Sequence, residues 1–374
     1  MERLPAAVCV GESMAVLLPD QPGPLEDVSS FHPSSGGAEA NVARGLVALG
    51  VPTAWVGRVG DDGFGRRVTR DLAAGGVDIR GVSVDSRRPT GLYVKEVGLG
   101  GSVLHYYRDG SAGSAIGPSV LDDPSAGPLL GGARLVHLSG ITAALSDSAL
   151  ELTRELLLRP RDGQLVSFDL NWRPALWRRR GPGRPEAVLA PLLNAADIVL
   201  LGADEATAVL GTGDPAELRA LLPGPATLVV KDDAHHATAL TRRSTGAGDA
   251  VSGDSSVTEP ALNVEVVEPV GAGDAFAAGY LTGTLRGYGP RRCLRLGHLA
   301  AAATLVVPGD HGPPPPPDLV DGLLRASAAD WAATTVRASG IGRPLVTGHA
   351  VPMARAEETD RSGAADRSVE EGSR

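Results

Sequence analysis

Short apolar runs and longer amphipathic segments alternate along most of the chain. The apolar runs are rich in β-branched residues, which favours buried strands. They are AAVCVGES at 6–13, TAWVGRVG at 53–60, ARLVHLSG at 133–140, QLVSFDLN at 164–171, DIVLLG at 197–202, TLVVK at 227–231 and VEVVEP at 264–269. Helical periodicity occurs in 38–49, 63–74, 148–158, 204–210, 215–222, 274–286 and 291–306. This alternation predicts an α/β fold in which crossover helices cover a mostly parallel sheet.

Two stretches, 13–32 and 90–109, have the pattern of hairpins instead. In the second, TGLYVKEV and SVLHYYRD flank the Gly-rich turn GLGG. We predict that both stretches form a small β lid on one domain that spans 6–330. HGPPPPPD, at 311–318, is predicted to be a rigid connector to the last helix, with a ligand for a partner module as the alternative. Periodicity is lost near residue 335, which predicts a disordered tail at 335–374.

Composition and charge narrow the classes of function. With 374 residues and 43% hydrophobic content the chain can bury a large core. A formal net charge of −9 without a long basic run argues against nucleic-acid binding. No stretch approaches the roughly 20 apolar residues of a membrane span, so no membrane contact is expected. Cys9 and Cys293 are the only cysteines and lack metal-binding spacing, which favours the reducing cytoplasm.

The tetrapeptide Gly-Ala-Gly-Asp occurs twice, at 246–249 and at 271–274. A Gly-rich turn binds phosphate when it follows a strand and opens a helix, because unpaired amides and the helix dipole then converge on the anion. The later copy lies between NVEVVEP and AFAAGYLTGTLRG, a strand and a helix by pattern. The earlier copy lies between TRRS and AVSGDSSVTEP, whose serines and glycines oppose a helix start. We therefore assign phosphate binding to 271–274; spacing alone leaves a tight strand-to-helix turn as the alternative.

Asp274, the last residue of the later copy, is a candidate catalytic base. An acid on the first helical turn beside an anion hole can accept the proton of an attacking hydroxyl. An ordinary helix-start acid is the alternative reading. The chain has no G-x-x-x-x-G-K-[ST], G-x-S-x-G or H-E-x-x-H, which argues against Walker-type NTPases and the commonest hydrolases. GRVGDDGFG lacks G-x-G-x-x-G, which disfavours a nicotinamide-dependent enzyme.

Three segments carry a resemblance to a known family. They are SSGGAEANVARGLVALG at 34–50, VGRVGDDGFG at 56–65 and EPVGAGDAFAAGYLTG at 268–283. Together they resemble the signature regions of the ribokinase-like (PfkB) carbohydrate kinases, over about 6–326. VLHYYRDGSAGSAI, HLSGITAALS, FDLNWRPALW and PGDHGPPP are most similar to the 2-keto-3-deoxygluconate kinases of that family. The resemblance implies a doubly wound ribokinase-like αβα domain with a small β-sheet lid, and ATP and Mg²⁺ as cofactors.

The resemblance also implies roles at the sugar end of an active site. Asp274 would be the base for the primary hydroxyl, and Gly271, Ala272 and Gly273 the anion hole. The sugar pocket would be lined by Gly37, Ala38, Glu39 and Asn41, with Tyr93, Tyr106 and Arg108 from the lid and Arg173 from the sheet. Asp310 would contact a distal substrate hydroxyl or order the loop behind the nucleotide. Two arginines that converge on a pocket favour a sugar acid, because a guanidinium binds a carboxylate bidentately; either arginine could instead pair with surface acids.

On the nucleotide side the chain departs from the family pattern. The resemblance implies nucleotide contacts at Asp169, Asn171 and Lys231. The usual V-K-x-G-x-x-G turn reads VVKDDAHHATAL, with Asp233 and His236 at glycine positions, which predicts weakened ATP affinity through strain and repulsion. Only Glu205 of the metal motif is present, because Gly202 stands at its Asn position; Glu205 could hold Mg²⁺ through water.

Two histidine positions admit more than one reading. His298 is a candidate adenine neighbour or a satisfied helix histidine. His235 and His236 could suggest a metal site, but neighbours on a strand point to opposite faces, which favours solvent-facing turn residues.

The sequence leaves two alternatives to a sugar-acid kinase open. One is a neutral-sugar kinase of the same family, of fructokinase or ribokinase type. The other is a catalytically impaired protein that binds a sugar acid. A homo-oligomer could form through the lid edge. STGAGDAVSGD, at 244–254, lies between the apparent strands HATALT and LNVEVVEP, and we interpret it as a flexible insertion in a hairpin turn.

Overall fold

The computed structural model describes residues 4–98, 101–181, 183–242 and 254–342. Within these residues a nine-stranded sheet has the order β13-β12-β11-β10-β9-β8-β1-β4-β5. The strands are β1 (Ala7–Val10), β4 (Thr53–Gly60), β5 (Val82–Asp85), β8 (Leu135–Ser139), β9 (Leu165–Asp169), β10 (Ile198–Gly202), β11 (Thr227–Asp232), β12 (His236–Thr241) and β13 (Ser255–Pro260). All neighbours pair in parallel except β11–β12 and β12–β13. The predicted α/β fold is confirmed.

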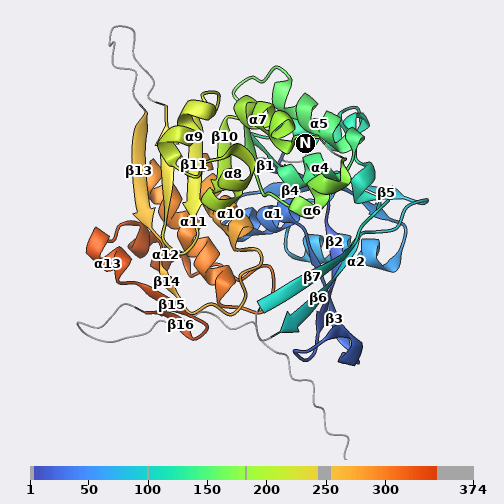
Figure 1. The fold of residues 1–374 in the computed structure, drawn as a ribbon, viewed down its shortest axis with the longest axis horizontal. Helices are drawn as coiled ribbons and strands as arrows, with labels where there is room; N and C mark the ends of the chain where they lie inside the picture. The colour runs from blue at the N-terminus through green and yellow to red at the C-terminus, as the bar shows by residue number, and fades with distance from the viewer. Residues whose placement is uncertain (1–3, 99–100, 182, 243–253, 343–374) are drawn as a thin grey trace, which may run out of the picture.

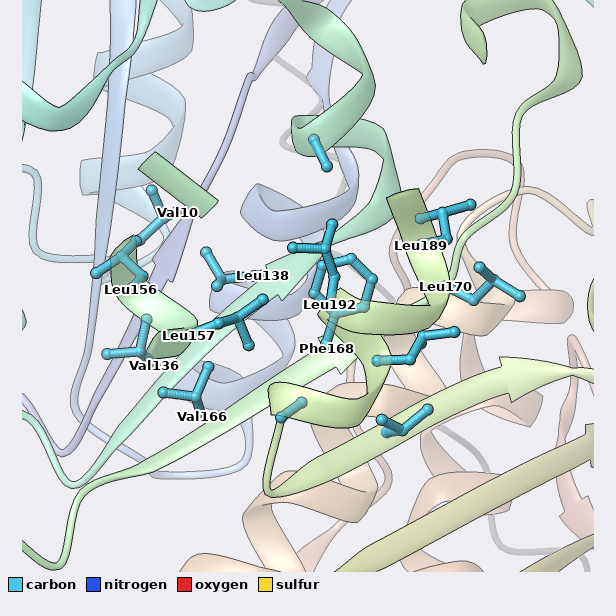
Figure 2. Close-up of a cluster of buried hydrophobic side chains, with 14 of the residues drawn as sticks. Val10, Val136, Leu138, Leu156, Leu157, Val166, Phe168, Leu170, Leu189 and Leu192 are labelled. Atoms are coloured by element: carbon cyan, nitrogen blue, oxygen red, sulfur yellow. The ribbon is translucent and has the colours of Figure 1, made fainter. Parts of the chain in front are cut away.

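Helices cover both faces of this sheet (Figure 1). Strand β1 is buried on both sides, so Val8 and Val10 pack into one core while Ala7 and Cys9 pack into the other. The first core lies under α3 (Ala126–Gly132), α4 (Gly140–Leu145), α5 (Asp147–Leu158), α6 (Pro174–Arg179), α7 (Pro185–Ala195), α8 (Ala203–Leu210) and α9 (Pro215–Leu221). Figure 2 shows Phe168 of β9 in this core, close to Leu192 of α7. The second core lies under α1 (Ala38–Ala48), α2 (Gly63–Ala74), α10 (Ala272–Leu285) and α11 (Pro290–Leu305).

A separate four-stranded sheet, the small sheet, stands beside the main one, with the order β3-β2-β6-β7. Its strands are β2 (Met14–Pro19), β3 (Phe31–Gly36), β6 (Leu92–Gly98) and β7 (Gly101–Tyr107). In Figure 1 the β6 and β7 pair crosses in front of β2 at the lower right. Both hairpin stretches contribute, although β3 runs to Gly36, beyond the predicted end at 32. Short 3-10 turns lie at Leu25–Asp27, Gly113–Ala115 and Pro118–Leu121.

The strand predicted at 264–269 is wrong for most of its length. Only β14 (Asn263–Val264) is a strand, and it pairs with β15 (Thr335–Arg337) in a third, three-stranded sheet rather than with the main one. The hairpin partner of β12 is β13, which the sequence pattern did not reveal. Val264 and Val266 line a cavity, so the alternation of these valines reflects that wall and not pairing with the main sheet. The copy at 271–274 therefore follows a loop.

The chain beyond the polyproline connector is more ordered than predicted. It forms α12 (Pro317–Leu324), α13 (Ala328–Ala332), β15 and β16 (Gly340–Gly342). Val336 and Ile341 are buried against Trp331, so the predicted tail is wrong for 335–342 because these apolar residues complete a third core. The rest of the predicted tail, and 244–253 of the predicted insertion, lie outside the described residues. Among the described helices, none is long and apolar enough to cross a membrane.

Candidate functional site

A cavity of about 240 Å³ lies between the small sheet and the carboxyl ends of the parallel strands. Ligands of open parallel sheets bind at this edge, because the loops that leave the strands converge there. The cavity collects most of the predicted site residues: Gly37, Ala38, Asn41, Tyr93, Tyr106, Arg108, Asp169, Asn171, Arg173, Glu205, Lys231, Gly271, Gly273, Asp274 and Asp310. Of the two tetrapeptide copies, the one at 271–274 is therefore at this cavity, while 246–249 lies outside the described residues.

Gly271 opens α10 in a conformation that requires glycine. Its φ is +85°, in the left-handed region, and a Cβ there would lie 2.0 Å from the carbonyl oxygen of Asp310. Two residues on, a Cβ at Gly273 would lie 3.8 Å from Lys231 Nζ. The first turn of α10 thus presents backbone next to an ammonium group, which is a suitable arrangement for an anion.

Asp274 lies at the floor of the cavity between two amide side chains. Asn41 Nδ2 donates to one carboxylate oxygen at 3.0 Å, and Asn171 Nδ2 donates to the other at 3.4 Å. Burial raises the pKa of Asp274 to about 7; the Asn41 hydrogen bond opposes this rise, and the charge of Asp169 adds to it. A carboxyl that titrates near neutrality is suited to exchange a proton with a substrate hydroxyl.

Lys231, near the end of β11, pairs with the carboxylate of Asp169 and lies in the field of Glu205. Its Nζ donates to Asp169 Oδ2 at 3.1 Å. Burial alone would lower the pKa of Lys231, but the charges of Asp169 and Glu205 outweigh it, and the pKa lies above its usual value. Lys231 is therefore a fixed cation beside the first turn of α10.

Glu205 acts locally as a helix cap. One oxygen accepts from the backbone N–H of Gly202 at 3.2 Å and the other from that of Trp172 at 3.1 Å. Burial raises its pKa. Within the described residues no group of three His, Cys, Asp or Glu side chains could by itself hold a metal ion. One or two carboxylates with water and phosphate oxygens are a donor set that Mg²⁺ accepts, so Glu205 and Asp169 fit an ion brought in with a nucleotide.

Two arginines line the cavity, Arg108 beside the small sheet and Arg173 beside Glu205. Arg108 is 7% exposed, contacts the carboxylate of Glu12 and lies 5.7 Å from the centre of the Tyr106 ring. Arg173 is more open, and its Nη1 is 3.4 Å from Glu205 Oε1. Both guanidiniums line the cavity although each already has a carboxylate partner.

Asn41 adds a polar atom that awaits a partner. Its Oδ1 is buried and accepts no hydrogen bond in the described structure. An unsatisfied buried acceptor on a cavity wall is costly unless a ligand supplies a donor. A ligand hydroxyl at this position would satisfy it.

Glu39 does not line the cavity, which corrects the prediction. Its side chain is fully buried beneath α1, where Ser139 Oγ and Thr142 Oγ1 donate to it at 2.5 and 2.6 Å. A Cβ at Gly11 would lie 2.3 Å from its carboxylate, so Gly11 is the residue that makes room for it. Burial raises the pKa of Glu39. Gly37, Ala38 and Asn41 of the same GGAEAN stretch do line the cavity, because successive helical residues point in different directions.

A second cavity, of about 440 Å³, adjoins the first. Lys231, Glu205 and Gly273 line both, so the two cavities meet at the start of α10. The second cavity also contains the predicted Ala272, Asp233, His236 and His298, with Phe276 beside them. It is mostly apolar away from the junction, as a site for a flat ring system would be.

Comparison of the sequence with models of protein families identifies the family. The model described as pfkB family carbohydrate kinase matches residues 5–316. The chain belongs to this family. It is a carbohydrate kinase, a phosphotransferase with an alcohol group as acceptor.

Individual relatives agree with the family match. The kinase is 36% identical to a 2-dehydro-3-deoxygluconokinase of Thermoproteus tenax, over 87% of this chain and 96% of that protein. It is 32% identical to a 2-dehydro-3-deoxygluconokinase of Bacillus subtilis, over 81% of this chain and 90% of that protein. Its structure matches that of a fructokinase with bound ATP from Xylella fastidiosa with a TM-score of 0.69 and 26% identity, over 82% of this chain and 94% of that one.

The turn between β11 and β12, which departs from the family pattern, keeps the backbone expected of glycine at one position. Asp233 has φ of 38°, which only a few non-glycine residues adopt readily. The argument that His235 and His236 point to opposite faces is wrong: β12 begins at His236, and His235 is in the turn. Both Nδ1 atoms lie near the same Asp232 oxygen, at 3.4 and 3.5 Å.

His298 fits the interpretation as a satisfied helix histidine, and its position next to an adenine stays a prediction. Its Nε2 is 3.2 Å from the carbonyl oxygen of Glu259, and its ring packs edge-on against Phe276. Burial lowers its pKa to about 4, so the imidazole is neutral at pH 7. The ring is a satisfied helix histidine that also forms part of the second cavity wall.

Sequence reasoning missed Glu12 in the first cavity. Glu12 is 2% exposed, contacts Arg108 and accepts a hydrogen bond from Ser111. Gly91 and Gly113 both leave space for it, because a Cβ at either would lie 2.8 Å or less from its side chain. The signal available was a single acid in GES directly after a buried strand.

Proposed function

We propose that this kinase transfers the γ-phosphoryl group of ATP to the primary hydroxyl of a sugar acid, with 2-keto-3-deoxygluconate as the leading candidate. The observation that carries the proposal is the position of Asp274, which lines the polar cavity directly after Gly273, a residue that lines both the polar and the apolar cavity. A sugar in the first and a nucleotide in the second would bring an acceptor hydroxyl and a terminal phosphate together there. The names of the two relatives, 2-dehydro-3-deoxygluconokinase, support the substrate.

Asp274 would act as the general base. Its carboxylate accepts the proton of the attacking hydroxyl while oxygen attacks the γ-phosphorus in line with the leaving ADP oxygen. The hydrogen bonds from Asn41 and Asn171 hold both carboxylate oxygens and so fix its orientation. Asn41 Oδ1, which has no partner in the described structure, would accept a hydrogen bond from another sugar hydroxyl.

Charge on the transferring group would be balanced from two sides. The backbone at Gly271, Ala272 and Gly273 forms the anion hole, and Lys231 supplies a cation near Gly273. Mg²⁺, carried in with ATP, would neutralise phosphate oxygens, with Glu205 and Asp169 as its protein anchors. The β6 and β7 pair of the small sheet would act as a lid that keeps water from the reacting phosphate.

The acid end of the sugar would face Arg108 and Arg173. Glu12 neutralises part of the Arg108 charge and holds its guanidinium in place, which leaves the other donors of the fork for a ligand carboxylate. Tyr106 lies under the same guanidinium. These contacts distinguish a sugar acid from a neutral sugar of the same length.

A coupled ADP-release assay tests the proposal. The kinase is incubated with ATP, Mg²⁺ and, in turn, 2-keto-3-deoxygluconate, other sugar acids, ribose and fructose. The position of the phosphate on each product is then determined. We expect the highest kcat/KM with a sugar acid and phosphate on the primary hydroxyl. A preference for ribose or fructose would contradict the proposed sugar-acid substrate. Binding of the sugar acid without turnover at saturating ATP would contradict the proposed kinase reaction.

The pH dependence of kcat/KM should report Asp274. A base must be unprotonated to act, and the pKa of Asp274 is raised to about 7 in the free protein. The rate should therefore fall about tenfold per pH unit below that pKa and level off above it. The measurement is kcat/KM between pH 5 and 9 at constant ionic strength. A rate that stays flat down to pH 5 would contradict this role.

Removal of either arginine should weaken sugar-acid binding selectively. Arg108→Ala and Arg173→Ala should each raise KM for a sugar acid about 10- to 100-fold, because a charged hydrogen bond is lost. KM for a neutral sugar should change little. Arg184→Ala removes an exposed arginine paired with Glu186 and serves as the control. Equal effects on acidic and neutral sugars would contradict carboxylate recognition.

The altered turn should weaken ATP binding. Asp233→Gly/His236→Gly should lower the Kd of ATP about fivefold, because an exposed carboxylate near phosphates costs about 1 kcal/mol. Asp233→Asn keeps a residue that tolerates left-handed φ and removes the charge, so it separates repulsion from strain. The measurement is isothermal titration calorimetry with Mg-ATP at low and high salt. An unchanged Kd in both variants would refute the prediction.

A further inference from the structure

Strand β6 turns two buried polar side chains toward the body of the protein. Tyr93 and Lys95 are two residues apart, so they point to the same face of the strand, and each is 3% exposed. Tyr93 OH donates to the Asp310 carboxylate, and the Lys95 ammonium contacts the Glu268 carboxylate. One strand of the small sheet therefore holds two loops of the main domain.

Both loops flank the turn that opens α10. Glu268 precedes Gly271 in the chain by three residues. Asp310 follows α11, and a Cβ at Gly271 would lie 2.0 Å from its carbonyl oxygen. The Gly271 turn is thus confined from both sides by residues that the small sheet holds.

Glu268 makes the more direct of the two connections. Its Oε2 accepts a hydrogen bond from Ser102 Oγ of β7 at 3.2 Å, in addition to its contact with Lys95. Its Oε1 accepts from the backbone N–H of Val270 at 3.1 Å. A single carboxylate, 6% exposed, therefore joins two strands of the small sheet to the peptide just before Gly271.

A gain in stability alone would not explain the buried ion pair of Lys95 and Glu268. Burial of an ammonium and a carboxylate costs desolvation that their attraction only partly returns, and apolar replacements of such pairs are often neutral or stabilising. A buried pair does, however, define relative position, because either charge left alone is strongly penalised. The chain has only two lysines, and both Lys95 and Lys231 are paired with carboxylates around the start of α10.

We propose that Lys95 and Glu268 form a latch that sets the position of the 271–274 turn relative to the small sheet. They are positioning residues for phosphoryl transfer, and this inference rests on the proposed function. With the latch made, the amides of the turn and Asp274 are held in register with a sugar under the small sheet. Misplacement of reacting groups by about 1 Å can cost about 100-fold in rate, so the latch should act on kcat.

A double-mutant cycle separates position from stability. Lys95→Met and Glu268→Gln should each lower kcat about 10- to 100-fold and also lower the melting temperature, because each leaves a buried group without its partner. The double variant should recover most of the melting temperature but keep the low kcat. If kcat recovers together with the melting temperature, activity tracks stability and the latch is overturned. Glu96→Gln is the matched control, because Glu96 lies on the opposite face of β6 and pairs with His105 at 2.7 Å.

Amide hydrogen exchange on the same variants gives a readout independent of turnover. Exchange of the amides at 268–274 should be about tenfold or more faster in Lys95→Met and in the double variant than in the wild type, and unchanged in Glu96→Gln. If the wild-type protein phosphorylates none of the sugars tested, the proposed function fails, while faster exchange in 268–274 still supports the latch. Unchanged exchange there overturns the latch even in an active kinase.

Discussion

Asp274→Asn should lower kcat about 10³-fold, which is within the range expected for loss of a general base. The amide has almost the same shape as the carboxylate, so Asn41 and Asn171 keep a neighbour of similar size, and binding of sugar and ATP should change little. The measurement is single-turnover phosphoryl transfer together with Kd for both substrates. Activity equal to that of the wild type would exclude Asp274 as the base.

The chain contains its own matched control for this substitution. Asp249 ends the other Gly-Ala-Gly-Asp copy, outside the described residues. Asp249→Asn makes the same chemical change in the same tetrapeptide, and it should leave kcat within about twofold of the wild type, as expected for a change that removes no catalytic group. A large loss of rate in this variant would overturn the choice between the two copies.

Gly271→Ala should be the second most damaging substitution. The new methyl group would lie 2.0 Å from the Asp310 carbonyl oxygen, so the loop or the helix start must move. Such a shift displaces the anion hole, and we expect kcat to fall at least about 100-fold. The measurement is kcat at saturating substrates, beside the melting temperature.

Gly287→Ala distinguishes steric displacement from backbone strain. Gly287 also has a left-handed φ, +71°, but a Cβ there would meet no atom within 4 Å. Both alanine variants should therefore share a strain cost of about 1 kcal/mol in stability, and only Gly271→Ala should lose activity. If Gly287→Ala loses as much activity as Gly271→Ala, the loss reflects strain or stability rather than the anion hole.

Local pattern predicted the elements that are buried on both sides or on one clear stripe. The strand at 53–60 and the helix at 63–74 have the predicted bounds, because their periodicity reports a burial pattern that the main sheet imposes. The same reasoning failed at 264–269, where alternating valines line a cavity. It also failed at 335–342, where short strands are buried by a third core that no local period reveals.

The candidate site likewise has a part that the sequence predicted and a part that it did not. Motif and family resemblance led to Asp274, Lys231 and Asn41, but the partnerships among side chains came only from the fold. Asn41 and Asp274 are hydrogen-bonded although they are 233 positions apart in the chain. Glu39 was misplaced because helical phase alone does not say whether a residue faces a cavity or the sheet beneath it.

The sequence by itself determined the class of fold, the family and the segments that carry the chemistry. Periodicity and motifs are local features of the chain, and short-range sterics and burial turn them directly into helices, strands and turns. Only the tertiary structure decided which charges meet. Glu12 and Arg108 pair, Lys95 and Glu268 pair, and the two cavities join at Lys231. Such pairings depend on strand order and on how the small sheet sits against the main one, and both are set by packing between segments that are distant in the chain.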